Sequence, residues 1–386
     1  MIFGRHSVLK RGCSTWDPNA VPRAEFEARL AATRQAMAER RLDGLVIYGD
    51  NYSFADLCYL TNYFPKVRGG IVVVPREGAL ALLLNIGSRD IPFAKTLTWV
   101  DDIRASNQVG GAGAELVKEK GLAKARIGLV DSCRGFPLPQ LEEMKRGLPD
   151  VQWVEADALF EPMRLKKTAL EMNALREAGD VLRAVVAGAE KIIKPGRKEY
   201  EIVADIDRLA RDAGAEDIRI LAGETRLQPP SFKQTAAVGD HWAVHLAVQH
   251  ERYWAEAGRT YILSGDGKIQ AAYRKAQDIV AGMAAELKPG HSVAAIDEIA
   301  RRQLGEFYAA AAVYGLGNGL GLNQWEAPFL SESDAREVGV RSVGAKELAE
   351  SMVVALRVVF ESEGKLILFG DSFLVTASGP ASLLGK

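Results

Sequence analysis

Apolar positions in the first 160 residues alternate between the spacing of helices and that of buried strands. Residues 24–44 keep apolar side chains at helical spacing and end in Asp-Gly, which predicts a helix leading into a buried strand at 45–48. The same reading predicts strands at 71–75, 80–84 and 126–131 and helices at 113–122 and 138–148. This alternation indicates an α/β N-terminal domain, which we place at residues 1–158.

The second domain, residues 159–386, begins with a helical pattern at 161–193 after a proline-containing turn and contains a weak internal repeat. Lys-Pro-Gly occurs at 194–196 and again at 288–290, each time between two helical stretches. Pro-Gly ends a helix, and the amphipathic pattern after it starts another. Two equivalent helix pairs beside a sheet predict a pseudo-twofold α+β body.

Four short segments of the second domain have strand or glycine-rich character. They are 253-YWAEAGRTYIL-263, 317-GNGLGLNQWEAP-328, 352-MVVALRVVF-360 and 364-GKLILFGDSFLVTASG-379. β-branched and aromatic residues predict central strands of an antiparallel sheet. Glycine at every second position of 315–321 permits close backbone approach or a sharp turn. Residues alone leave two readings open: a curved sheet lining a pocket, or an ordinary sheet with a glycine-rich loop.

These segments resemble motifs of the creatinase, prolidase and aminopeptidase P family. The resemblance covers nearly the whole chain and is clearest from about residue 160 onward. It implies a creatinase-like N-terminal α/β domain, and a "pita-bread" C-terminal domain with a pseudo-twofold, curved antiparallel sheet. In many members this domain holds two metal ions that activate a water molecule. The resemblance also implies a homodimer.

The metal-ligand positions of the family are altered in this chain. The Arg259-Thr260 pair places Glu256 at the second metal-binding aspartate and His245 at the first, eleven residues upstream. The other matches are Asn318 for the "GHG" histidine, Trp325-Glu326 for the substrate-contacting "HE" pair, Arg357 for the "EPG" glutamate, and Gly370 for the last glutamate, before Asp371. A permanent guanidinium cation replaces a carboxylate that should neutralise the metals. We therefore expect no metal and no other cofactor.

The creatinase branch of the family hydrolyses a C–N bond without metal, and it suggests two further residues. Its catalytic histidine corresponds to Gln228, counted back from Gly239-Asp240, and glutamine cannot carry protons. This difference argues against creatine as the substrate. A loop arginine that reaches the partner's pocket in creatinase-like dimers corresponds to Arg68 in 66-KVRGGIVVV-74.

The remaining side chains suggest acid–base chemistry on a small anion. His245 is the best candidate for proton transfer, and Glu256 can orient it. Arg357 and Asn318 can bind a carboxylate or stabilise an oxyanion, and Trp325 offers an apolar face. Each residue also has a structural alternative: His245 can make a core hydrogen bond, Glu256 and Arg357 can form a salt bridge across the sheet, and Trp325 can serve as packing.

Three functions follow from these residues. The first is a metal-independent, creatinase-like hydrolase or lyase that acts on a C–N bond of a small carboxylate-bearing molecule. The second is a pseudoenzyme that keeps the peptidase fold as a binding module. The third is a silent subunit that supports an active paralogue.

Composition limits partners and location. Lys plus Arg number 49 and Asp plus Glu number 50, without basic clusters, so the charge pattern favours neither nucleic acid nor a membrane surface. The amino terminus lacks an apolar run of signal-peptide length, and three scattered cysteines, Cys13, Cys58 and Cys133, fit a reduced cytoplasmic compartment. Outside the site, we expect His241, His250 and His291 to be exposed.

Overall fold

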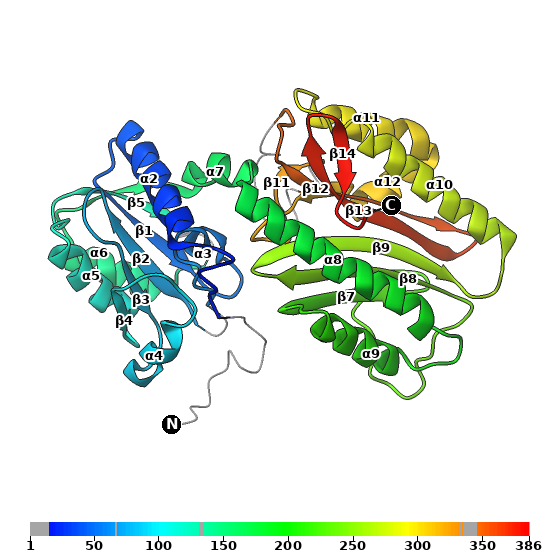
Figure 1. The fold of residues 1–386 in the computed structure, drawn as a ribbon, viewed down its shortest axis with the longest axis horizontal. Helices are drawn as coiled ribbons and strands as arrows, with labels where there is room; N and C mark the ends of the chain where they lie inside the picture. Colours follow the sequence, from blue (N-terminus) through cyan, green and yellow to red (C-terminus); the bar gives the residue numbers. More distant parts are fainter. Residues whose placement is uncertain (1–14, 66–67, 131–134, 332–333, 335–345, 386) are drawn as a thin grey trace. The chain divides into compact units, whose positions relative to one another are not determined.

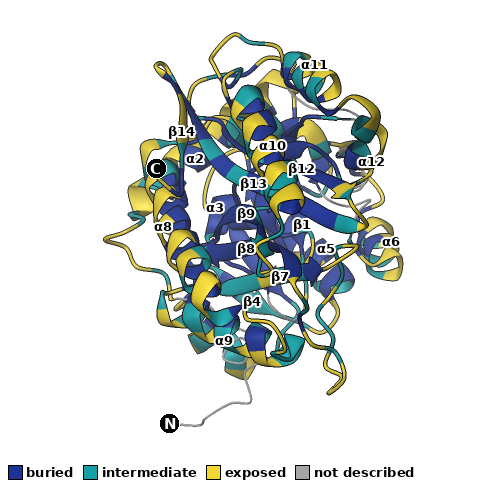
Figure 2. Ribbon diagram, turned by 90° about the vertical axis from the view of Figure 1, so that its right-hand side faces the viewer, coloured by how far each residue is buried: buried dark blue, intermediate teal, exposed yellow. Residues whose placement is uncertain are grey.

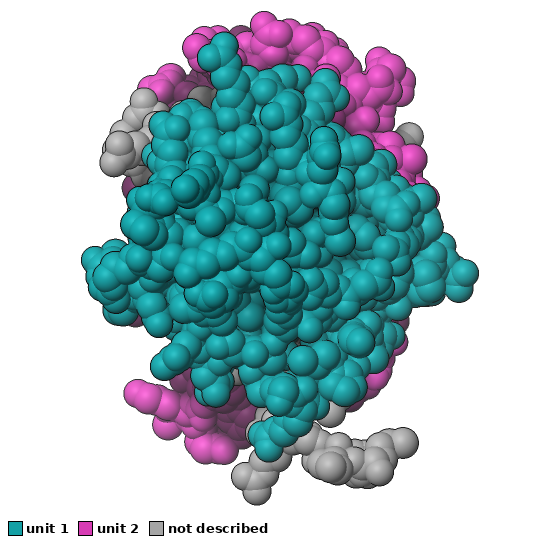
Figure 3. Space-filling model, turned by 90° about the vertical axis from the view of Figure 1, so that its left-hand side faces the viewer, with its two compact units in different colours: residues 1–163 teal, residues 164–386 magenta. Residues whose placement is uncertain are grey.

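The computed structural model describes residues 15–65, 68–130, 135–331, 334 and 346–385. By its internal contacts the chain divides into two compact units, residues 1–163 and 164–386, coloured separately in Figure 3. No helix within the described ranges has the length and apolar character needed to cross a membrane. Of the three cysteines, Cys58 is buried and free, whereas Cys13 and Cys133 lie outside the described residues.

The first unit is an α/β domain, as predicted (Figure 1). Its elements are α2 (Arg23–Glu39), β1 (Gly44–Gly49), α3 (Ala55–Thr61), β2 (Gly70–Pro75), β3 (Ala81–Leu84), η1 (Ser88–Asp90), α4 (Ile91–Ala94), β4 (Ile103–Ala105), α5 (Val109–Glu119), β5 (Arg126–Val130), α6 (Leu138–Gly147), β6 (Gln152–Glu155) and η2 (Asp157–Leu159). The six-stranded sheet has the order β4-β3-β2-β1-β5-β6. Every residue of β1, β2 and β3 is buried, which explains their unbroken apolar runs.

The helix predicted at 161–193 is two helices, α7 (Glu161–Leu165) and α8 (Ala169–Ile192). Thr168 interrupts them because it caps α8: its side chain accepts from the Glu171 backbone N–H, and the Glu171 carboxylate accepts from the Thr168 N–H. The prediction of one continuous helix was therefore wrong. The T-x-x-E capping box that separates the two helices was visible in the sequence.

The second unit is built on a curved antiparallel sheet. Its elements after α8 are α9 (Glu199–Asp212), β7 (Asp217–Gly223), β8 (His241–His250), β9 (Tyr253–Ile262), α10 (Gly267–Ala284), α11 (Val293–Leu304), η3 (Gly305–Phe307), α12 (Tyr308–Val313), β10 (Gly317–Gly319), β11 (Glu326–Phe329), β12 (Val353–Ser362), β13 (Lys365–Thr376) and β14 (Gly379–Ser382). The strand order is β11-β10-β12-β13-β9-β8-β7, and β14 pairs with β13.

The predicted repeat has a structural counterpart in two helix pairs, α8–α9 and α10–α11. Gly196 and Gly290 both have positive φ, +79° and +82°, which glycine adopts without strain. The N–H of Gly196 donates to Val238 O and the N–H of Gly290 to Leu348 O, each at 2.8 Å. The same turn and an equivalent backbone hydrogen bond thus occur twice, giving the pseudo-twofold body that the Lys-Pro-Gly pair predicted.

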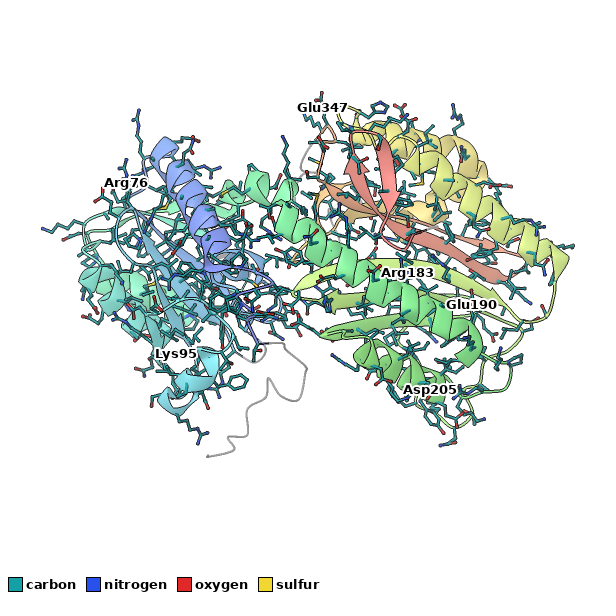
Figure 4. All side chains as sticks on the ribbon, in the orientation of Figure 1. Arg76, Lys95, Arg183, Glu190, Asp205 and Glu347 are labelled. Carbon is teal, nitrogen blue, oxygen red and sulfur yellow. The ribbon has the colours of Figure 1, made fainter. Side chains whose placement is uncertain are left out.

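One face of this sheet carries the main core, and the opposite face carries the candidate site. Alternate residues of β12, Leu356, Val358 and Phe360, pack with the buried side of α10 and with α11. Figure 2 shows most of β8 and β12 in dark blue and α10 with a buried and an exposed side. The outward side of α8 carries exposed charges such as Arg183 and Glu190 (Figure 4). Arg357 lies between Leu356 and Val358, so its side chain points to the other face.

Candidate functional site

The site begins with an antiparallel hairpin that places His245 beside Glu256. In the β8–β9 pairing His245 lies opposite Gly258, and Ala247 lies opposite Glu256. The two side chains are therefore diagonal neighbours on one face of the sheet. His245 Nε2 lies 3.6 Å from Glu256 Oε2, and both side chains are buried. The sequence prediction that these two residues converge is met by this geometry.

A row of facing residues continues from His245 across the sheet. Gly258 faces Gly370 on β13, and Gly370 faces Arg357 on β12. Leu368 packs over Gly258, where a Cβ would lie 2.6 Å from its Cδ1, and neither glycine has a side chain of its own to block Arg357. Its guanidinium crosses toward β9, where Nη1 lies 3.1 Å from Glu256 Oε1.

Arg357 is the centre of a buried polar network. Nη1 donates to Glu256 Oε1 and to Asn318 Oδ1 (2.8 Å), Nη2 donates to Asp334 Oδ1 (2.8 Å), and Nε donates to Tyr314 O (3.2 Å). A guanidinium has five N–H donors, and these bonds use four of them. The salt bridge predicted as the structural alternative for Glu256 and Arg357 is present. Arg357 therefore holds protein groups together, and the prediction that it binds a substrate carboxylate conflicts with this use of its donors.

The charge state of Glu256 follows from its neighbours. Burial alone raises its pKa, but His245, Arg357 and the Gln324 amide outweigh burial and lower it to about 2. Gln324 Nε2 donates to Glu256 Oε2 at 2.8 Å. Burial raises the pKa of Asp334, with Arg357 opposing that effect. Glu256 is thus a carboxylate at any physiological pH.

The Trp325-Glu326 pair makes its contacts outside the Arg357 network. Glu326 is buried and accepts from Lys167 Nζ at 2.9 Å and from Arg164. Lys167 and Arg164 hold the pKa of Glu326 below its usual value despite burial. Trp325 packs beside Ala327 and Phe329. The substrate-binding roles predicted for this pair are not favoured by these contacts, because the carboxylate is already paired with two cations.

The other predicted residues lie apart from the network. The Gln228 side chain accepts from Arg226 Nε at 2.9 Å, and the Gln228 backbone pairs with that of Ala222. Arg68 is exposed and belongs to the first unit. Its reach toward a second subunit stays a prediction.

The expectation that His241 is exposed was wrong. It is 1% exposed, and its Nε2 is 2.7 Å from Leu366 O. His241 is the first residue of β8, and its imidazole is held by the Leu366 carbonyl of β13. His250 and His291 are only partly exposed, and their Nδ1 atoms lie 2.9 Å from Gly214 O and 3.1 Å from Glu286 Oε2.

Family models match both units of the chain. Residues 173–377 match the model described as metallopeptidase family M24, and residues 29–166 match the creatinase/prolidase N-terminal domain. The chain belongs to metallopeptidase family M24. The resemblance seen in the sequence is thereby confirmed, and with it the fold: a creatinase-type N-terminal domain followed by a pita-bread domain.

Individual M24 relatives agree with this assignment. The Xaa-Pro dipeptidase of Pyrococcus horikoshii is 24% identical over 257 residues, covering 64% of this chain and 70% of the relative. The crystal structure of the prolidase from Pyrococcus horikoshii OT3 superposes with a TM-score of 0.76 at 18% identity, covering 93% and 98% of the two chains. Dipeptidase PepE from Mycobacterium ulcerans gives 0.76 at 23% identity, covering 97% and 98%. These relatives are peptidases, hydrolases that cleave a C–N bond.

The M24 name implies metal ions, and the donor set of this chain does not fit them. In the described ranges, no three His, Cys, Asp or Glu side chains are grouped to hold a metal ion. Of the side chains gathered here, Glu256 and Asp334 are both paired with Arg357, whose positive charge lies between them. A cation placed there would meet a fixed cation and lose both carboxylates. The side chains gathered here therefore do not form a metal site.

Sequence reasoning missed three residues of this site: Asp334, Gln324 and Arg219. Asp334 also accepts from Ser331 Oγ at 2.6 Å and is buried, although it lies outside every motif. Gln324 directly precedes Trp325 in the 317–328 segment, so a polar side chain next to a family motif was the available signal. Arg219 lies on β7, a strand that the sequence did not predict, and donates to Gln324 Oε1 at 2.7 Å.

Proposed function

We propose that this protein is a metal-independent hydrolase that acts on a C–N bond of a small carboxylate-bearing molecule. The observation that carries this proposal is the His245–Glu256 pair, which remains together while Arg357 takes the place of a family metal-ligand carboxylate. Membership in a family of C–N hydrolases supports the reaction class.

In this proposal His245 transfers the proton and Glu256 positions it. Glu256 faces Nε2 of the imidazole and, with its pKa near 2, stays ionised to stabilise the imidazolium. Water adds to the carbon of the C–N bond as His245 removes its proton. The bond then breaks, and His245 returns the proton to the leaving nitrogen. Arg357 fixes the position of Glu256 through their ion pair.

A second candidate is a binding module without catalysis. The specific observation in its favour is the saturation of the network, in which Arg357 uses its donors on Glu256, Asn318 and Asp334. Such mutual satisfaction is what a stabilised core requires. A silent subunit of a heteromeric enzyme is the third candidate, and it predicts that a relative with intact metal ligands co-purifies with this chain.

Release of ammonia or amine from a panel of N-acyl, N-carbamoyl and guanidino acids tests the hydrolase proposal. We expect wild type to turn over at least one compound after treatment with a chelator. His245→Gln should lower the rate about 10²–10⁴-fold, the usual contribution of a general acid–base group. His250→Gln, outside the network, is the matched control. Equal rates in wild type and His245→Gln, or activity that requires added Mn²⁺, Co²⁺ or Zn²⁺, would sink the proposal.

A further inference from the structure

Arg219 lies in the same cross-strand row as Glu256. On β7 it faces Ala247 of β8, and Ala247 faces Glu256 of β9. Facing residues of an antiparallel sheet point to the same side. Arg219 and Glu256 therefore project from one face, separated by the small side chain of alanine.

Two contacts fix the guanidinium of Arg219. Its Cζ lies 4.5 Å from the ring centroid of Trp254, a fully buried residue whose position is set by the core. Its Nη1 donates to Gln324 Oε1 at 2.7 Å, and Gln324 Nε2 donates to Glu256 Oε2 at 2.8 Å. One side-chain amide thus separates Arg219 from the proposed catalytic pair, and the stacking sets the plane of its N–H groups.

The two arginines of this face differ in what they can still bind. Arg357 is buried and uses four of its five donors on protein groups. Arg219 is exposed, and its one hydrogen bond within the described part of the chain goes to a neutral amide. No carboxylate among the described residues forms an ion pair with it, although Asp217 and Glu256 lie near enough to act on it through space. Its Nε and Nη2 donors are therefore available to a planar oxyanion.

We propose that Arg219 anchors the substrate by its carboxylate and places the C–N bond beside His245 and Glu256. This inference rests on the proposed function and names its substrate more narrowly: a short acid that lies beside the Gln324 amide, since that single amide is hydrogen-bonded to both Arg219 and Glu256. N-Carbamoyl, N-acyl and guanidino derivatives of small amino acids have this form. Arg219 takes the anion-binding role that the sequence had suggested for Arg357.

Binding of matched acids and amides tests this assignment. The probes are N-acetylglycine, N-carbamoylglycine and guanidinoacetate, each paired with its primary amide, in calorimetry and thermal-shift measurements. We expect wild type to bind at least one acid about tenfold or more above its amide, as loss of a charge-assisted hydrogen bond implies. Arg219→Met should lose that preference, and Arg219→Lys should keep part of it. Arg208→Met, at an exposed arginine of α9, should bind as wild type does.

The outcomes separate this inference from the proposed function. If Arg219→Met binds acids as well as wild type, or if no acid is preferred over its amide, the anchor is wrong. Turnover of an acid with an unchanged KM in Arg219→Met would leave the hydrolase standing without the anchor. Acid binding that depends on Arg219, without any turnover, would leave the anchor standing and favour the binding module. A raised KM with a smaller change in kcat is the result expected if both hold.

Discussion

Removing Arg357 is expected to destabilise the second unit more than any other single change at the site. Arg357→Met deletes the charge-assisted hydrogen bonds to Glu256 and Asp334, whose side chains are 3% and 1% exposed. Each such bond contributes about 1.5–3 kcal/mol. Glu256 keeps its bond from Gln324, and Asp334 keeps its bond from Ser331, so neither carboxylate is left without a donor. We therefore expect a loss of about 3–4 kcal/mol, at the lower end for a broken buried ion pair.

Hydrogen exchange under increasing urea, read by mass spectrometry on peptides of β9 and β12, measures this loss in the second unit alone. The triple variant Arg357→Met/Glu256→Gln/Asp334→Asn is the control, because it replaces with amides the two carboxylates that lost their ion pair to Arg357. It should recover at least half of the lost free energy of unfolding. A loss below about 1 kcal/mol in Arg357→Met, or a triple variant no more stable than the single one, would refute the reasoning.

Three further predictions concern charge, metal and space in the same network. Because the pKa of Glu256 is lowered to about 2, its stabilisation is complete above its unfolded pKa of about 4.3 and disappears as pH falls toward 2. Between those two pH values wild type should lose about 3 kcal/mol of unfolding free energy that Glu256→Gln does not lose. An equal pH dependence of unfolding free energy in the two proteins would contradict the lowered pKa. Arg357→Glu places three carboxylates together, so Mn²⁺ or Zn²⁺ should raise the melting temperature of this variant and leave that of wild type unchanged. Elemental analysis of purified wild type should find no stoichiometric metal. Gly370→Ala brings a Cβ within 2.9 Å of Leu356 O and should cost about 1–3 kcal/mol in urea unfolding, whereas Gly267→Ala, with no atom within 4 Å, should be neutral; equal effects would refute the steric argument.

The sequence was most informative where local pattern and tertiary environment agree. Buried strands such as β1 and β2 are apolar throughout, so their pattern predicted them within one residue at each end. Strand β4 has three residues and β6 is half exposed, and neither carries enough pattern to be predicted. The Lys-Pro-Gly turns predicted the repeat because a left-handed glycine is required at the same point of both halves.

At the site, motif spacing predicted which residues meet but not how they share hydrogen bonds. His245, Glu256, Asn318 and Arg357 converge because their strands belong to one sheet. The contact from Asp334 to Arg357 joins residues 23 positions apart, which no spacing rule specifies. The roles of Glu326 and Trp325 were also set by distant partners, since the pairing of Glu326 with Lys167 joins residues 159 positions apart.

The glycine row between His245 and Arg357 makes the arginine and a metal site mutually exclusive states of one scaffold. A cation bound by Glu256 and Asp334 would meet the guanidinium that pairs with both, and a glutamate at position 370 would bring a Cβ within 2.9 Å of Leu356 O whatever side chain stands at 357. A glutamate at position 370 alone creates this clash, and a glutamate at position 357 alone leaves Glu256 and Asp334 without their cation. A metal site on this face would therefore require both the loss of the arginine and a shift of β12 at Leu356.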